Sequence, residues 1–333
     1  MSDSPSTGRR RAREWPYARY QPFRSTVAEA AAQWFVGREF EVDRRYPYIL
    51  ARRDDWPKNI LVREVADYVD QKKREKLGSE PFPLHKYIHH GLSSQALLFN
   101  LVGPLLLQGD MTPLISALRA HRPDIPDVAW NPELEYGSRD TFNEASGQPT
   151  SIDLALLPPA SSTGGIFIEC KFVEREFGTC SVFQGGDCDG RNPTADLDKC
   201  YLHFIGRTYW QVAAEHGLLD GPIRTEALCP FAFHYQLFRE LLLAAKHDGI
   251  FVLLSDARSP VFYQTGPLGD RGLIPAVTAM LPESLKERVV LLTVQDVLGE
   301  IRQSLDPDWV PGFERKYGMD GKEIDGLLPR HRR

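Results

Sequence analysis

Apolar and polar residues alternate with a period of two in two short segments near the middle of the chain. In residues 166–172, Glu169 and Lys171 fall on one face of a strand, because successive side chains point to opposite faces. In residues 151–157, Asp153 is set apart in the same way. The pattern predicts two strands that hold charges on rigid elements, which costs desolvation and is typical of a functional site. The opposite faces are apolar and comprise Ile152, Leu154 and Leu156 in the first strand and Ile166, Ile168, Cys170 and Phe172 in the second.

The segment between these strands predicts a hairpin. Pro158-Pro159 ends the first strand, and serines and glycines in residues 161–165 supply a turn. Antiparallel pairing can then bring Asp153 beside Glu169, with Lys171 within reach. Two carboxylates are hard oxygen ligands that suit Mg²⁺ or Mn²⁺, and a lysine can orient a water or offset charge that develops on phosphorus. This combination of groups fits phosphodiester hydrolysis.

The flanking segments predict further elements around the hairpin. Residues 92–102 show helical spacing after a serine cap, and we expect this helix to end near residues 103–104, a Gly-Pro pair. Residues 133–136 alternate like a strand. Residues 235–245 form an apolar helical stripe, followed by a buried strand at 250–254. The predicted order is helix, three strands, helix, strand.

Asp153, a spacer and Glu169-Cys170-Lys171 resemble the motif of the PD-(D/E)XK nuclease superfamily, although Ile152 stands where the motif has proline. The resemblance implies an α/β fold with a restriction-endonuclease-like αββαβ core, a mixed central sheet flanked by helices. It also implies Mg²⁺ held by Asp153 and Glu169, with Lys171 as the third catalytic residue. Residues 90–258 are further similar to a bacterial group of restriction endonucleases.

Three other residues are candidates for supporting roles in such a site. Gln95 stands in the first predicted helix where many relatives have glutamate, and it could contact a metal-bound water or the DNA backbone. Tyr235 and Arg239 lie one helical turn apart on the second core helix and could reach the site, although Tyr235 also fits the apolar stripe.

Composition sets the domain organisation that we expect. The chain has 333 residues, of which 42% are hydrophobic and 26% charged, enough for a substantial core. We expect a basic flexible tail at 1–25, a helical extension at 26–88, a nuclease domain at 89–305 with a cysteine-containing insertion at 173–230, and a peripheral tail at 306–333. The net charge of −5 excludes a generally basic nucleic-acid binder but allows a positively charged cleft. With no apolar run long enough for a membrane span and no signal-peptide core, we expect a cytoplasmic protein.

The cysteines raise a separate question. Their odd number, five, argues against a disulfide framework, and Cys170 belongs to the core face of its strand. The remaining four could bind Zn²⁺ or an iron–sulfur cluster. We expect separate thiols instead, because no Cys-x-x-Cys pair is present. These four are Cys180, Cys188, Cys200 and Cys229.

These observations lead to the hypothesis of a Mg²⁺-dependent DNA endonuclease of the restriction or defence type, with DNA as partner and a homodimer as a further expectation. One alternative is a repair-type exonuclease of the same fold with an iron–sulfur cluster. Another is a catalytically silent DNA- or protein-binding module. The charged strand argues against the silent module, since a purely structural strand would place neutral residues there.

Overall fold

A computed structural model describes most of the chain, namely residues 20–75, 82–145, 149–160, 164–262, 265–266, 269–270, 272–305 and 307–320. Most of the basic flexible tail expected at 1–25 and the last residues of the tail expected at 306–333 lie outside the described residues.

A five-stranded mixed sheet forms the centre of the molecule, as expected for an α/β protein. The strand order is β1-β2-β3-β4-β7. The first three strands are antiparallel, whereas β3, β4 and β7 run parallel to one another. A separate pair, β5 (Thr265–Gly266) and β6 (Gly269–Asp270), is antiparallel. The strands of the main sheet are β1 (Asn131–Ser138), β2 (Thr150–Leu157), β3 (Ile166–Lys171), β4 (Ile250–Ser255) and β7 (Val289–Thr293).

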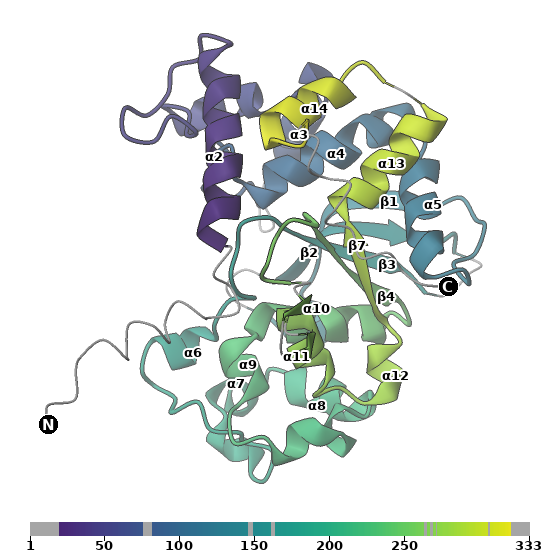
Figure 1. The fold of residues 1–333 in the computed structure, drawn as a ribbon. Coiled ribbons are helices and arrows are strands. Elements are labelled where there is room, and N and C mark those ends of the chain that lie inside the picture. The colour runs from purple at the N-terminus through teal and green to yellow at the C-terminus, as the bar shows by residue number, and fades with distance from the viewer. Residues whose placement is uncertain are drawn as a thin grey trace, which may run out of the picture.

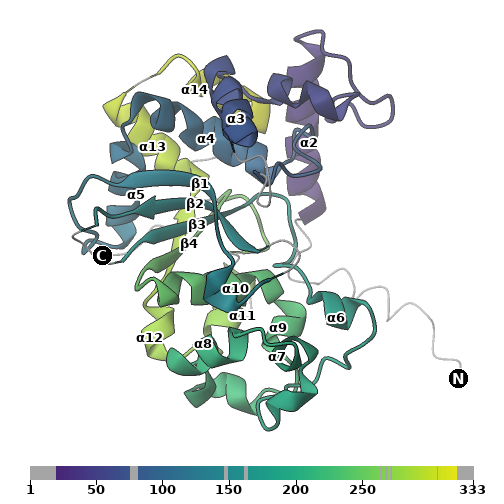
Figure 2. The same cartoon turned by 180° about the vertical axis from the view of Figure 1, so that it is seen from behind.

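Helices cover both faces of the sheet (Figures 1 and 2). One face carries helices from both ends of the described chain, and the other carries helices that follow β3. Two of these helices begin at side-chain caps: Ser93 accepts a hydrogen bond from the Ala96 N–H, and Thr293 forms a capping box with Asp296. The first layer comprises α2 (Tyr20–Val36), α3 (Arg63–Glu75), α4 (Ser94–Gln108), α5 (Thr112–His121), α13 (Val294–Ser304) and α14 (Val310–Tyr317). The second comprises α8 (Tyr209–Glu215), α9 (Pro230–Phe233), α10 (Tyr235–Lys246), α11 (Leu273–Thr278) and α12 (Glu283–Lys286).

Short helical turns complete the chain between these elements. Most of them lie in the segment between β3 and α10, where the chain has little regular structure. The short α-helices are α6 (Ser181–Gln184) and α7 (Tyr201–Phe204), and the 3₁₀ turns are Arg53–Asn59, Asp140–Phe142, Leu197–Lys199, Leu218–Asp220 and Pro222–Thr225.

Helix α4 extends to Gln108, past the Gly103-Pro104 pair where we expected it to end. Gly103 serves close packing instead, since an added Cβ would lie 2.4 Å from a methyl carbon of Val65 on α3. The helix is buried through Leu105, and this packing outweighs the backbone hydrogen bond that Pro104 cannot make. It ends at Gly109, which adopts the left-handed conformation typical of a C-terminal cap.

The segment after residue 306 is not wholly peripheral, contrary to our expectation. It contains α14, which packs against α2 (Figure 1). Phe313 and Tyr317 lie four residues apart on its buried face, and Asn100 of α4 donates a hydrogen bond of 2.8 Å to the Tyr317 hydroxyl. Composition suggested a tail because prolines and glycines surround this short amphipathic helix. Helix α2 likewise begins at Tyr20, inside the segment expected to be a flexible tail.

Candidate active site

Strand β3 places Glu169 and Lys171 on the face of the sheet that packs against α10. Phe167 on the same face belongs to the α10-side core, whereas Ile168 and Cys170 belong to the core of the opposite layer. All six residues of the strand are buried. The predicted alternation is therefore confirmed, and two opposite charges are held inside the protein.

Asp153 lies where the pairing of β2 with β3 stops. The last paired residues of this ladder are Leu154 and Ile168. Beyond them, the Cys170 N–H donates a hydrogen bond of 2.8 Å to Asp153 Oδ2. The predicted hairpin thus brings Asp153 to the strand that carries Glu169.

The face that we predicted for Ile152, Leu154 and Leu156 is split. Ile152 packs in the α10-side core, whereas Leu154 and Leu156 pack in the other. Regular alternation breaks at Asp153, and Glu135 lies across from it on β1 with a φ of 51°. A non-glycine residue in this conformation is uncommon in a strand and often marks a functional position.

Lys171 is enclosed by partners of opposite or complementary polarity. Its Nζ donates to Glu169 Oε1 at 2.6 Å and to Gln236 Oε1 at 2.8 Å, and Gln236 Nε2 donates to Glu169 Oε1 at 2.6 Å. Burial alone would lower the pKa of Lys171, but the surrounding carboxylates, Glu169 foremost, raise it above its usual value. The lysine is therefore charged and held in one orientation.

The acidic side chains around Lys171 outnumber this single cationic side chain. Glu240 follows Gln236 by one helical turn, is 1% exposed, and has one oxygen, Oε2, that is buried without a hydrogen-bond partner. Burial and the nearby Glu169 carboxylate raise the pKa of both Asp153 and Glu240 well above the usual range. The site can accept additional positive charge.

Gln95 reaches this region through Glu135. Its Nε2 donates to Glu135 Oε1 and, at 3.0 Å, to the Pro83 carbonyl, while its Oε1 accepts the His85 N–H at 2.9 Å. Glu135 in turn contributes to the raised pKa of Asp153. The side chain of Gln95 therefore holds the 83–85 segment and an acidic neighbour of Asp153 in place.

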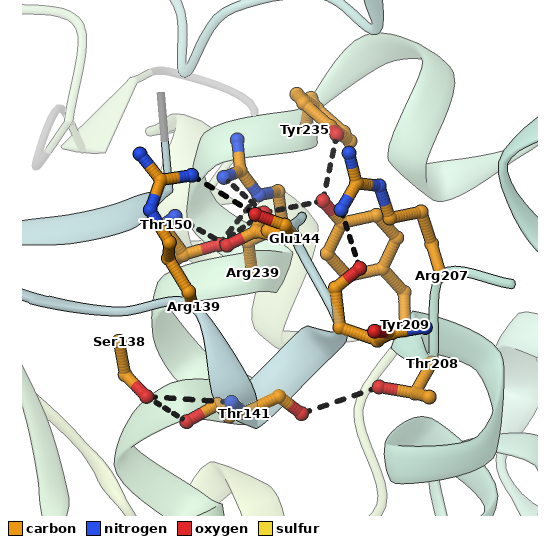
Figure 3. A network of polar contacts seen from close by, with 11 residues as sticks. Ser138, Arg139, Thr141, Glu144, Thr150, Arg207, Thr208, Tyr209, Tyr235 and Arg239 are labelled. Carbon is orange, nitrogen blue, oxygen red and sulfur yellow. Dashed lines mark hydrogen bonds and ion pairs between the residues drawn. The ribbon is translucent and has the colours of Figure 1, made fainter. Parts of the chain in front are cut away.

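Tyr235 and Arg239 point to a different buried group, the Glu144 carboxylate (Figure 3). Arg239 Nη2 donates to Glu144 Oε1 at 2.7 Å, and its Nε donates to Thr150 Oγ1 at 2.8 Å. The Tyr235 hydroxyl donates to that of Tyr209, which donates to Glu144 Oε1 at 2.5 Å. This network joins the β1–β2 connection to α8 and α10, and α10 contacts Glu169 and Lys171 through Gln236 instead.

Sequence reasoning missed Glu135, Gln236, Glu240 and Glu144. Gln236 and Glu240 did carry a signal, because two polar residues at i and i+4 share a helical face next to an apolar stripe. Gln236, Arg239 and Glu240 also line an open cavity of about 250 Å³ beside the first residues of β2.

The four cysteines that follow Lys171 all line one small cavity, of about 30 Å³. Their spacing along the chain, without a Cys-x-x-Cys pair, does not indicate this common cavity. Cys170 lies apart from them in the core, as expected. All five are free cysteines.

The described ranges contain no group of three or more His, Cys, Asp or Glu side chains that could hold a metal ion. None of the helices there combines the length and apolar character that a membrane crossing requires.

One comparison with known proteins identifies the family. Residues 28–318 match the family model described as restriction endonuclease associating with ARP. Comparison with curated proteins and with solved structures gave no significant match. Because the family match covers most of the 333 residues, the chain belongs to the restriction endonucleases associating with ARP, a family whose description indicates a nuclease.

Proposed function

We propose that the chain is a Mg²⁺-dependent DNA endonuclease whose site consists of Asp153, Glu169 and Lys171. The observation that carries this proposal is the buried Glu169–Lys171 pair at the point where β2 and β3 separate, with the Asp153 carboxylate fixed on the β3 backbone. The family match supports the class of enzyme. The order α4, β1, β2, β3, α10, β4 contains the succession of an αββαβ core with one further strand, which supports the proposal.

The donor set fits a divalent cation. Asp153 and Glu169 offer hard oxygen ligands, and Mg²⁺ typically uses one or two carboxylates, with water and substrate phosphate completing its coordination. Mn²⁺ has the same ligand preference. When bound, the cation would neutralise part of the excess acid and polarise the scissile phosphate.

The residues of the chain itself have separable roles in this proposal. Gln236 holds Lys171 against Glu169, so the ammonium group is already oriented before DNA binds. Lys171 then offsets the negative charge that grows on the phosphate as a water oxygen attacks phosphorus and a phosphorus–oxygen bond breaks. Because Lys171 is only 6% exposed, this charge acts more strongly than it would in bulk water.

Cleavage of closed circular DNA tests the proposal. The wild-type protein should cut such DNA with Mg²⁺ or Mn²⁺ but not with a chelator present. Asp153→Asn should lower the rate by about a hundredfold or more, because a metal ligand is lost. The asparagine oxygen can still accept the Cys170 N–H, and one buried charge is removed, so the thermal midpoint without metal should be unchanged or higher.

Asp67→Asn is the matched control, since Asp67 is 71% exposed on α3 and away from the site. It should cut like the wild type. Cutting without a divalent cation, or equal rates for Asp153→Asn and the wild type, would contradict the site. Digestion of linear DNA alone would leave the site standing but would identify an exonuclease.

A further inference from the structure

The loop that follows α2 and the loop that precedes α4 lie against each other. The Gly91 N–H donates to the Tyr48 carbonyl at 2.8 Å, which joins the two loops through their backbones. Arg53, at the start of the first 3₁₀ turn, donates from Nη2 to the Leu84 carbonyl at 3.0 Å and joins them a second time. These segments, far apart in sequence, therefore form one continuous surface.

This surface adjoins the proposed nuclease site. Gln95, whose side chain is bonded to Glu135, also accepts the His85 N–H from the loop before α4. At the start of α2, the Tyr20 hydroxyl donates to the Val173 carbonyl, just beyond the end of β3, at 2.7 Å. DNA that reaches the end of β3 therefore meets both loops and the first turns of α2.

Five cationic side chains on this surface have no carboxylate partner in the part of the chain that the structure describes. One of them is partly exposed on α2, and the other four are exposed. Together they are called the cationic surface below, and they are Arg24, Arg45, Arg53, Lys86 and Arg175.

Tyrosine rings take the place of carboxylates for four of these five cations. Each charged group lies over a ring, at a distance typical of a cation–π contact. Tyr46 and Tyr87 are themselves 40% and 46% exposed. The pairs, with the distance from the charged group to the ring centroid, are Arg24–Tyr48 at 5.7 Å, Arg45–Tyr46 at 5.2 Å, Lys86–Tyr87 at 4.8 Å and Arg175–Tyr20 at 5.4 Å.

The choice of ring over carboxylate decides what the cations can do. A ring orients a cation without cancelling its charge, whereas a carboxylate cancels it. Two acidic side chains in these segments are occupied by the backbone instead: Asp43 accepts N–H groups from the residues that follow it, and Glu174 accepts the Phe172 N–H. Exposed cations elsewhere are paired, as Lys246 is with Glu215. The cationic surface therefore keeps its positive charge available to an external anion.

The distribution of these charges favours a long polyanion over a small anion. The five side chains come from α2, from two loops and from the segment after β3, so they line an extended surface. A DNA backbone presents negative charges at regular short intervals and suits such an array. The exposed hydroxyls of Tyr46 and Tyr87 add donors of the kind that contact phosphate oxygens.

We propose that the cationic surface binds the DNA backbone beside the position of cleavage. That the ligand is DNA rests on the proposed function. In this division of labour, α2 and the two loops hold the DNA, and Lys171 acts on the phosphate that is cut. The division also answers an electrostatic problem, because the excess of acidic side chains around Lys171 would by itself repel DNA.

Binding of a fluorescently labelled duplex of about 30 base pairs tests this proposal, measured by anisotropy at several salt concentrations with a chelator present so that the DNA stays intact. A variant that combines Arg45→Ala, Arg53→Ala and Lys86→Ala should bind at least roughly tenfold more weakly. The slope of log affinity against log salt concentration should shrink by about two to three, since up to three phosphate contacts are lost. The thermal midpoint should stay unchanged, because all three side chains are exposed.

A matched control combines Arg74→Ala, Lys246→Ala and Lys286→Ala. It removes the same charge from three cations that have carboxylate partners and lie outside the cationic surface. The control should bind DNA nearly as the wild type does. Equal losses in the two triple variants would overturn the proposal, because net charge alone would then explain them. Wild-type affinity in the first variant would overturn it as well.

Cleavage kinetics separate this proposal from the proposed function. The first triple variant should need more DNA to reach half of its maximal rate, while its single-turnover rate at saturating DNA stays that of the wild type. A lower rate at saturation with unchanged affinity would overturn the role in binding. Wild-type protein that binds through this surface but cuts no DNA with Mg²⁺ or Mn²⁺ would instead refute the endonuclease and leave the surface standing.

Discussion

Replacement of Glu144 offers a direct test of the buried network in Figure 3. Its side chain is 3% exposed and accepts four hydrogen bonds, two from Thr150 and one each from Tyr209 and Arg239. Glu144→Ala would leave the Arg239 guanidinium, 15% exposed, without its carboxylate. Removing one partner of a buried ion pair costs about 3–5 kcal/mol, against a total of about 5–15 kcal/mol for a typical domain.

Urea denaturation followed by circular dichroism measures this cost. Glu144→Gln should lose less, about 2 kcal/mol, because the amide oxygen can still accept part of the hydrogen bonding. Asp67→Ala, which breaks only the exposed Arg63–Asp67 pair, should leave the free energy of unfolding nearly unchanged. A loss below about 1 kcal/mol for Glu144→Ala would refute the reasoning, because the buried pair would then contribute no more than a surface contact.

Lys171→Met should lower the cleavage rate by about a hundredfold while DNA affinity changes little, because the charge acts in the transition state; equal losses in single-turnover rate and in affinity would instead indicate a phosphate clamp. His121 Nε2 and Asp296 Oδ2 lie 3.3 Å apart, and the hydrogen bond between them raises the pKa of His121. Burial by itself would raise the pKa of the Asp296 carboxyl. The hydrogen bonds that this carboxyl accepts outweigh burial, so its pKa is lowered overall. The histidine stabilises the fold below its unfolded pKa of about 6.5 and loses this effect as pH rises through its folded pKa, whereas the aspartate loses its effect as pH falls below about 4. His121→Gln should therefore lower the free energy of unfolding most between about pH 4 and pH 6.5 and least near pH 9, and a pH-independent difference would exclude the ion pair.

The strands of the site could be predicted because their signal is local. A period of two in residues 151–157 and 166–172 was enough to place Glu169 and Lys171 on one face and Cys170 on the other, and the intervening turn indicated the hairpin. The error within these two strands concerned Ile152. The face of the sheet on which Ile152 lies depends on where the pairing of β2 with β3 ends. The alternation of apolar and polar residues does not indicate this end point.

Features that depend on contacts between distant segments could not be predicted. Gln236 reaches Glu169 only because α10 packs across β3, and the helical stripe does not specify the rotation of that packing. Arg239 was therefore expected at the site and instead pairs with Glu144. The convergence of the cysteines depends likewise on hydrogen bonds such as that from Cys229 to Gly190, which have no sequence signature.

The packing of α14 on α2 sets the order in which the molecule can be completed during synthesis. The hairpin β2–β3 joins neighbouring segments and can form early, since short loops close quickly. The layer behind the sheet instead needs Phe313 and Tyr317, which are synthesised after every strand of the sheet. Until then the apolar faces of α2 and α4 remain partly uncovered and open to aggregation. A chain that stops before residue 310 therefore carries every residue of the proposed nuclease site yet lacks part of the core that supports it.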